Sequence, residues 1–177
     1  MSKHLKHTQY NEVNLYNKIL FLSRNKFFYI DMKIHDTFQN RIILIFLHTS
    51  FLFVKIKQEN ISDLYKDFSQ KFFDYVFKII EVNLREIGWS DTRINKDMKL
   101  LVKEFYNILL ECEKYRSKNN KSKIEFLMKH ITIDDKKKTI NTDILTNYFD
   151  KYQSFCLDLS EYSVLKGDIN FSFNNNN

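Results

Sequence analysis

Two long amphipathic segments joined by a short hinge constrain the fold of this chain more than any other feature. The first begins near Ile61, and the second begins near Asn95 and ends at Tyr115. In both, apolar residues recur at intervals of three and four, which is the spacing of a helix that buries one face. Gly88 lies between them and has no Cβ, so it can adopt the left-handed conformation that ends a helix. The two helices must therefore bury their apolar faces against each other or against a third helix.

Each segment has an apolar face that can be read from its spacing. The face of the first helix comprises Leu64, Phe68, Phe72, Val76, Ile79, Ile80 and Ile87. The face of the second comprises Met98, Leu101, Val102, Phe105, Leu109 and Cys112. Ser62 or Asp63 can cap the first helix, because a side-chain oxygen there accepts a hydrogen bond from a free amide. The pattern predicts that Phe72 and Phe105 are buried.

Turn residues are too scarce for most β folds. The 177 residues include no proline and two glycines, whereas β-sandwiches and phosphate-binding loops need many turn glycines. Hydrophobic residues make up 44% of the chain, which is enough for one core. We predict an all-α fold, a single helical domain of about six helices around a long antiparallel helix pair. It should span residues 11–173, between a mobile N-terminal tail (1–10) and a disordered asparagine tail (174–177).

The most hydrophobic run extends from Ile42 to Ile56. As a helix it would be about 22 Å long, shorter than the roughly 30 Å of a bilayer's hydrocarbon layer. We interpret it as a central buried helix, and an interfacial membrane segment is the alternative. The N-terminus is polar and lacks the apolar core of a signal peptide. These patterns predict a cytoplasmic protein without a transmembrane helix.

The formal net charge of +6 would ordinarily indicate nucleic acid or an anionic membrane as a partner. However, only five of the 28 basic residues are arginine, and the chain contains no alanine. This bias is typical of an AT-rich coding sequence, which by itself raises the lysine content. We therefore do not predict sequence-specific binding of nucleic acid.

No catalytic or metal-binding pattern is found in the sequence. The five histidines do not form a pair with metal-ligand spacing, and there is no glycine-rich phosphate loop or nucleophile elbow. The expectation is a protein that is not an enzyme and has no cofactor and no metal. His48 lies within the apolar run, where a buried, hydrogen-bonded histidine is the simplest interpretation. The alternative is a small apolar-ligand carrier or enzyme, with a cavity for a quinone or lipid beside His48.

Several motifs occur in an order and spacing that resemble the ubiquinol–cytochrome c chaperone family. The early motif is Asp36-Thr37 followed by Arg41 and then Leu47-His48. The middle motif comprises Phe72-Phe73-Asp74, Leu84-Arg85-Glu86-Ile87-Gly88, Asp91, Lys96, Met98, Lys99 and Phe105-Tyr106. The resemblance covers about residues 15 to 115. The chain departs from the family pattern at Asn40, where glycine is common, and at Asn107-Ile108, which replaces Gly-Arg.

The resemblance implies a non-catalytic assembly chaperone for cytochrome b of ubiquinol–cytochrome c reductase, respiratory complex III. Such a protein would be peripheral on the inner face of the cytoplasmic membrane. The implied partners are cytochrome b or its nascent chain, the ribosome, an anionic membrane surface and a small accessory assembly protein. A basic helical module that binds RNA or the ribosome for another purpose is the alternative.

The candidate partner-binding residues come from these motifs and from the charged side of the second helix. Lys96, Lys99 and Lys103 follow Arg93 on one side of that helix, where they form either a partner surface or an ordinary solvated face. The complete candidate set is Asp36, Thr37, Arg41, His48, Arg85, Glu86, Trp89, Asp91, Arg93, Lys96, Lys99, Lys103 and Tyr106.

Overall fold

The computed structural model describes residues 2–58, 63–132 and 141–173, and over these residues the fold is all-α. It contains eight α-helices and one short 3₁₀ helix, η1. Their bounds are α1 (Ser2–Ser23), α2 (Lys26–Ile30), α3 (Phe38–Gln58), α4 (Asp63–Glu86), α5 (Asp91–Glu113), η1 (Tyr115–Ser117), α6 (Asn120–His130), α7 (Thr142–Asp158) and α8 (Glu161–Lys166). The all-α prediction is confirmed. The helix count exceeds the expected one because Asn25 and Ser160 cap two short helices, α2 and α8.

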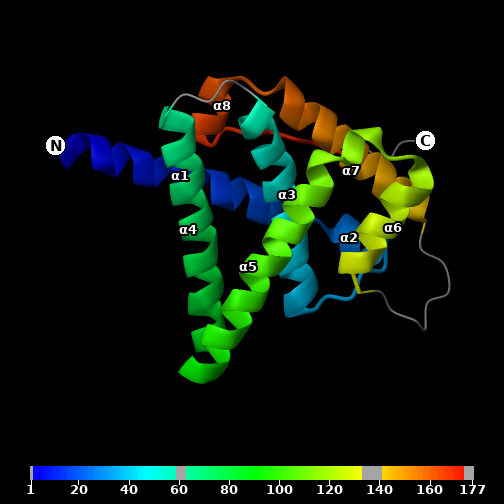
Figure 1. Ribbon diagram of the computed structural model, residues 1–177, viewed down its shortest axis with the longest axis horizontal. Helices are drawn as coiled ribbons and strands as arrows, with labels where there is room; N and C mark the ends of the chain where they lie inside the picture. Colours follow the sequence, from blue (N-terminus) through cyan, green and yellow to red (C-terminus); the bar gives the residue numbers. More distant parts are fainter. Residues whose placement is uncertain (1, 59–62, 133–140, 174–177) are drawn as a thin grey trace.

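Helix α3 is the centre of the fold, as predicted for the apolar run Ile42–Ile56, and the α4–α5 pair packs against it. In Figure 1, α4 and α5 form the two arms of a V that meet at the hinge, and α3 lies behind α5. Helix α3 contacts α1, α4, α5 and α7, and every residue from Ile42 to Leu52 is buried. The physical reason is its composition, because a helix that is apolar on all sides needs neighbours on all sides.

The same helix is the one described segment that is long and apolar enough to cross a membrane. This segment, Phe38–Lys57, has a mean hydropathy of 1.2, and 78% of it is buried within the protein. Other helices already cover its apolar surface. It is therefore a core helix here, as the sequence predicted for Ile42–Ile56.

The hinge between α4 and α5 follows from three consecutive signals in the sequence. The amide of Gly88 donates to the carbonyl of Arg85 at 3.0 Å, and the amide of Trp89 donates to the carbonyl of Leu84 at 3.2 Å. With Gly88 at φ +85°, these two bonds form the Schellman motif that closes a helix. Ser90 Oγ then accepts from the amide of Arg93, so α5 begins at Asp91 rather than at the predicted Asn95.

Helix α1 begins at Ser2, whereas the sequence analysis expected a tail up to residue 10. No glycine or proline occurs in this stretch, so nothing in the sequence interrupts the helical hydrogen bonds of the following turns. Gly167, at φ +65°, closes α8 against α1, where a Cβ would lie 2.6 Å from the carbonyl oxygen of Asn11. The Ser62 cap and the asparagine tail lie outside the described residues.

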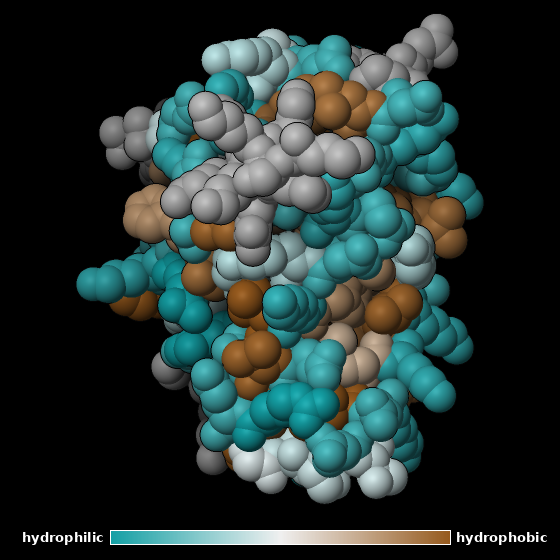
Figure 2. Space-filling view, turned by 90° about the vertical axis from the view of Figure 1, so that its left-hand side faces the viewer, coloured by the Kyte–Doolittle hydropathy of each residue, from teal (hydrophilic) through white to brown (hydrophobic). Residues whose placement is uncertain are grey.

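The predicted apolar faces are buried in their central turns and exposed at their ends. Phe68, Phe72 and Phe105 are buried as predicted. Leu64 and Ile87 are 55% and 54% exposed, because they lie in the first turn of α4 and just beyond its last residue. Figure 2 shows the face on the α1 and α4 side, where apolar side chains form separate spots between polar ones.

Candidate partner-binding site

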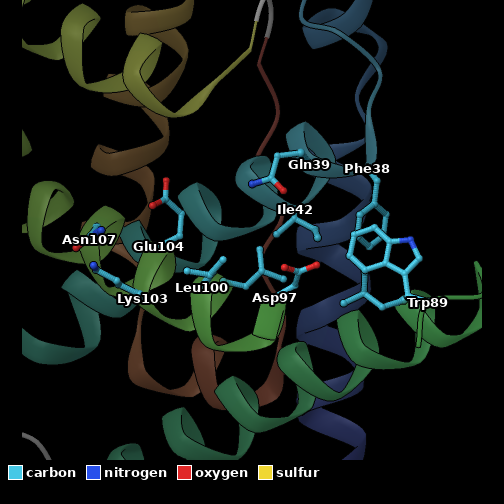
Figure 3. Close-up of a pocket in the computed structure, with 11 residues that line it drawn as sticks. Phe38, Gln39, Ile42, Trp89, Asp97, Leu100, Lys103, Glu104 and Asn107 are labelled. Carbon is cyan, nitrogen blue, oxygen red and sulfur yellow. The ribbon is translucent and has the colours of Figure 1, made fainter. Parts of the chain in front are cut away.

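A pocket of about 500 Å³ lies where the beginning of α3 meets the hinge and the outer side of α5. We call it the hinge pocket. Its lining consists of Phe38, Gln39, Ile42, Leu84, Trp89, Asp97, Leu100, Leu101, Lys103, Glu104 and Asn107. Figure 3 shows the rings of Phe38 and Trp89 together at one end, and Lys103, Glu104 and Asn107 at the other. One end of the pocket is therefore aromatic and the other is polar and charged.

Charged groups around the hinge hold the aromatic end in place. The guanidinium of Arg93 lies 3.5 Å from the centre of the Trp89 ring, and its Nε lies 3.5 Å from Oδ2 of Asp97. Arg85 donates to Glu81 Oε1 at 2.8 Å and also to Asp91, so it links the end of α4 to the beginning of α5. These contacts orient Trp89, and they engage the guanidinium of Arg93 with Trp89 and Asp97 within the protein.

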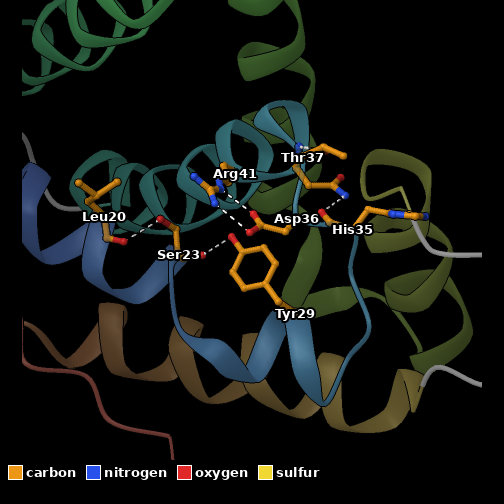
Figure 4. A network of polar contacts seen from close by, with 8 residues as sticks. Leu20, Ser23, Tyr29, His35, Asp36, Thr37 and Arg41 are labelled. Carbon is orange, nitrogen blue, oxygen red and sulfur yellow. Dashed lines mark hydrogen bonds and ion pairs between the residues drawn. The ribbon is translucent and has the colours of Figure 1, made fainter. Parts of the chain in front are cut away.

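The beginning of α3 carries the early motif. Thr37 caps the helix, because its Oγ1 accepts from the amide of Asn40 at 3.2 Å. Arg41 donates to both oxygens of Asp36, from Nε at 2.6 Å and from Nη2 at 2.8 Å, as Figure 4 shows. The bidentate hydrogen bond from Arg41 holds the pKa of the Asp36 carboxyl below its usual value. The motif therefore fixes the entry of the chain into α3.

A second hollow of about 220 Å³ adjoins the hinge pocket on the side of α1. Arg41 and Glu86 are part of its lining, and it shares Phe38 and Ile42 with the hinge pocket. The structure thus brings Arg41, Glu86, Trp89 and Lys103 into one surface region. Asp36, Thr37, Arg85, Asp91 and Arg93 support this region through the contacts described above.

Asn40 is a structural residue of this region that the sequence analysis did not recognise. Its side chain is fully buried, and its Nδ2 donates to the carbonyls of His35 at 2.9 Å and Thr132 at 2.7 Å. Its Oδ1 accepts from the amide of Thr132 at 2.9 Å. A glycine here would lose all three bonds. Because Thr132 is 92 residues away in the sequence, no local pattern identifies the contact.

His48 is a core residue, which corrects its place among the partner-binding candidates. Its Nδ1 donates to the carbonyl of Leu44 at 2.6 Å, and the Tyr148 hydroxyl donates to its Nε2 at 2.8 Å. The ring is fully buried against Phe28, Phe149 and the two tyrosines Tyr148 and Tyr152. No partner can reach this side chain, and aromatic rings occupy the space that the carrier alternative assigned to a cavity.

The burial of His48 predicts a loss of stability in weak acid. Desolvation lowers its pKa from 6.5 to about 4, so below pH 6.5 the unfolded chain binds a proton that the folded protein does not. The stability that the neutral, buried imidazole of His48 contributes is therefore complete above pH 6.5, and it is lost as the pH falls toward 4. Between about pH 7.5 and about pH 5 the free energy of unfolding should fall by about 2 kcal/mol from this group.

Urea unfolding at the two pH values measures this loss, and His48→Gln provides the control because glutamine does not titrate. The variant should have lower stability at neutral pH but a weaker dependence on pH than the wild type. An identical pH dependence in both proteins would show that His48 is not the responsible group.

The remaining candidates lie on α5. Lys96, Lys99 and Lys103 are exposed, and of the three only Lys103 reaches the hinge pocket. Tyr106 is half exposed and lines another pocket, of about 280 Å³, between α3, α4 and α5. Within the described residues, no group of three or more His, Cys, Asp or Glu side chains is arranged to hold a metal ion.

The described residues thus form an all-α domain with two adjoining surface hollows beside the hinge between α4 and α5. Residues 31–154 match the ubiquinol-cytochrome C chaperone family, and the chain belongs to this family. The crystal structure of the Cbp3 homolog from Brucella abortus has the same fold, with a TM-score of 0.81 and 22% sequence identity. The match covers 97% of this chain and 93% of that chain. A search of the curated proteins found no match.

Proposed function

We propose that the protein is a non-catalytic chaperone that assists the maturation of cytochrome b into ubiquinol–cytochrome c reductase, respiratory complex III. The observation that carries the proposal is membership of the ubiquinol-cytochrome C chaperone family over residues 31–154. The protein would hold cytochrome b, nascent or newly inserted, until haem and the partner subunits are in place. It would act as a peripheral protein on the inner, cytoplasmic side of the membrane.

The hinge pocket is the contact site that best suits such a client. Before assembly, a multi-helix membrane protein exposes apolar helices together with the short polar loops that join them. The aromatic end of the pocket, with Phe38 and Trp89, matches an apolar helix end. The polar end, with Lys103, Glu104 and Asn107, matches the adjoining loop. A preformed pocket also lowers the cost of ordering flexible loops on binding.

A small accessory protein and the ribosome are further proposed partners. The pocket beside Tyr106 has an apolar lining that includes Phe53, Phe73 and Phe105, and it lies apart from the hinge pocket. A small helical accessory protein could therefore occupy it while the client occupies the other. A ribosome would be attracted through its phosphates by the net positive charge of the protein, without reading a sequence.

Deletion of the gene should lower the amount of assembled complex III. We expect reduced haem b absorbance and ubiquinol oxidation in isolated membranes, while other respiratory complexes keep their activity. The wild-type gene should restore both signals. Trp89→Ala should restore them poorly, because it removes the aromatic end of the hinge pocket, whereas the matched control Tyr162→Ala, at an exposed position on α8, should restore them fully. Normal complex III in the deletion strain would overturn the proposal.

A further inference from the structure

The outer face of α5 and the residue that ends it carry four exposed lysines. Lys96, Lys99, Lys103 and Lys114 are exposed, and none of them forms an ion pair with the described residues. Lys96, Lys99 and Lys103 follow the i, i+3, i+7 spacing that places side chains on one side of a helix, and Lys114 returns to that side five turns after Lys96. Within the described residues, this face therefore carries a row of unpaired positive charges from Lys96 to Lys103, and Lys114 adds a fourth charge that Glu111 partly offsets.

The carboxylates of α5 are all paired with other groups. Asp91 pairs with Arg85, Asp97 with Arg93, and Glu104 with His130. Glu111 pairs with Lys118, and Glu113 pairs with Lys57. Each carboxylate of the helix thus contacts a basic side chain, and these lysines face the solvent. An ordinary solvated helix face would mix the two signs, with carboxylates facing lysines one turn away.

Three large apolar side chains lie among these lysines. Leu100, Tyr106 and Leu110 are 56%, 50% and 55% exposed. By helical spacing they belong to the same side of α5 as Lys96 and Lys103. Figure 1 shows that α5 crosses in front of α3, and the exposed fractions of these side chains show that this side of the helix faces solvent. From Lys96 to Lys114 the helix extends about 27 Å.

We propose that this face of α5 docks on an anionic lipid bilayer. The lysines would lie among the lipid phosphates, and Leu110 would enter the boundary between headgroups and acyl chains. Leu100 and Tyr106 lie beside it, at the rims of the hinge pocket and of the pocket beside Tyr106. The reason for such docking rests on the proposed function, because cytochrome b is assembled in a membrane. The proposal identifies the surface and the lipid chemistry that would hold the protein there.

The composition of the face favours a bilayer over RNA. Recognition of RNA relies on arginine forks and on aromatic rings that stack with bases. Arg93, which precedes the lysines on α5, interacts with Trp89 and Asp97. The exposed side chain of Leu110 has no role against a phosphate backbone, whereas in a bilayer interface it is removed from water. Lysine point charges are sufficient for a fluid layer of anionic headgroups.

Flotation with lipid vesicles tests the charge of the face. The full-length protein should bind vesicles of phosphatidylcholine mixed with phosphatidylglycerol, and added salt should weaken the binding. Reversal of Lys96, Lys99 and Lys103 to Glu should lower the partition coefficient by roughly 100-fold or more. The control reverses Lys26, Lys78 and Lys129, which are exposed on α2, α4 and α6, and gives the same net charge. Equal losses in the two triple variants would overturn the proposal, because only net charge would then matter.

Fluorescence tests the insertion of Leu110. The two native cysteines, Cys112 and Cys156, are buried, so a dye can be attached selectively at Leu110→Cys. A polarity-sensitive dye there should shift to the blue on anionic vesicles, whereas the same dye at Tyr162→Cys on α8 should not. No shift at position 110 would overturn the proposal, as would binding to poly(U) RNA in preference to vesicles. Neither measurement requires cytochrome b, so this proposal and the proposed function can fail separately.

Discussion

Phe105→Ala should lower the free energy of unfolding by about 3–5 kcal/mol, because it removes a buried ring at the junction of three helices. Phe105 is 1% exposed. Its ring meets Phe46 and Phe53 of α3, and Phe73 and Phe77 of α4, with centroid separations between 5.3 and 5.9 Å. Helices α4 and α5 diverge from the hinge with α3 packed against both, so they cannot move together to fill the space of the missing ring unless α3 also moves. The cavity should therefore stay open and the cost should lie in this range.

Urea unfolding monitored by circular dichroism at 222 nm, the standard helix signal, measures the loss. The matched control is Tyr106→Ala, the adjacent residue on the same helix, whose side chain is 50% exposed. It should cost about 1 kcal/mol, because a half-exposed ring buries less area than a core ring. If both variants lost the same amount, or if Phe105→Ala lost less than about 1 kcal/mol, the packing of α5 against α3 described above would be wrong.

The ends and faces of α4 and α5 could be predicted from the sequence because they depend on neighbouring residues. Gly88 ends α4 with a motif that needs only a left-handed residue and two backbone bonds. Phe72 and Phe105 are buried because the spacing of three and four residues places them on one side of a helix. The predicted start of α5 differs from the observed one (95 against 91) because apolar spacing gives no weight to Ser90 as a cap.

The arrangement of the helices depends on contacts between distant segments, and here the sequence analysis is less accurate. The apolar run Ile42–Ile56 predicts a central buried helix, but the sequence does not show how the α4–α5 pair packs against it. Periodicity gives the width of an apolar face and does not say which helix covers it. The position of α3 follows from contacts with α1, α5 and α7, which come from the beginning, the middle and the last third of the chain.

In the candidate site, too, local features could be predicted from the sequence and contacts between distant segments could not. Resemblance to the family selects Arg41 and Glu86, and the candidate Trp89 lies within the middle motif. The structure places these three residues around two adjoining hollows. The hollows themselves are not predictable from the sequence, because their walls combine the beginning of α3 with the middle of α5. For His48 the local argument from an apolar run is correct about burial. The family resemblance still places it among the partner contacts, since a motif does not distinguish a core residue from a surface residue.

Asn40→Asp should be the most damaging conservative substitution near the site. It keeps the shape of the side chain and replaces an amide that donates to two carbonyl oxygens, at 2.9 and 2.7 Å, by a carboxylate that repels them. Because Asn40 is fully buried, water cannot compensate the charge. The position lies in the first turn of α3, where the helix dipole favours a negative charge by about 0.3–1 kcal/mol. Desolvation and repulsion outweigh that benefit, and we expect a loss of at least about 3 kcal/mol at pH 7.

The loss should also depend on pH, which distinguishes a buried charge from a simple loss of packing. Burial would raise the pKa of the new carboxyl above its unfolded value, so the penalty is complete above the folded pKa and disappears as the carboxyl is protonated on acidification. The stability difference between the wild type and Asn40→Asp should therefore narrow as the pH falls from about 7 to about 4. Gln39→Glu, at the exposed preceding position, is the matched control and should stay within about 0.5 kcal/mol of the wild type. A difference that does not change with pH would mean that the introduced carboxylate reaches water, and that the contact between Asn40 and Thr132 does not seal this end of α3.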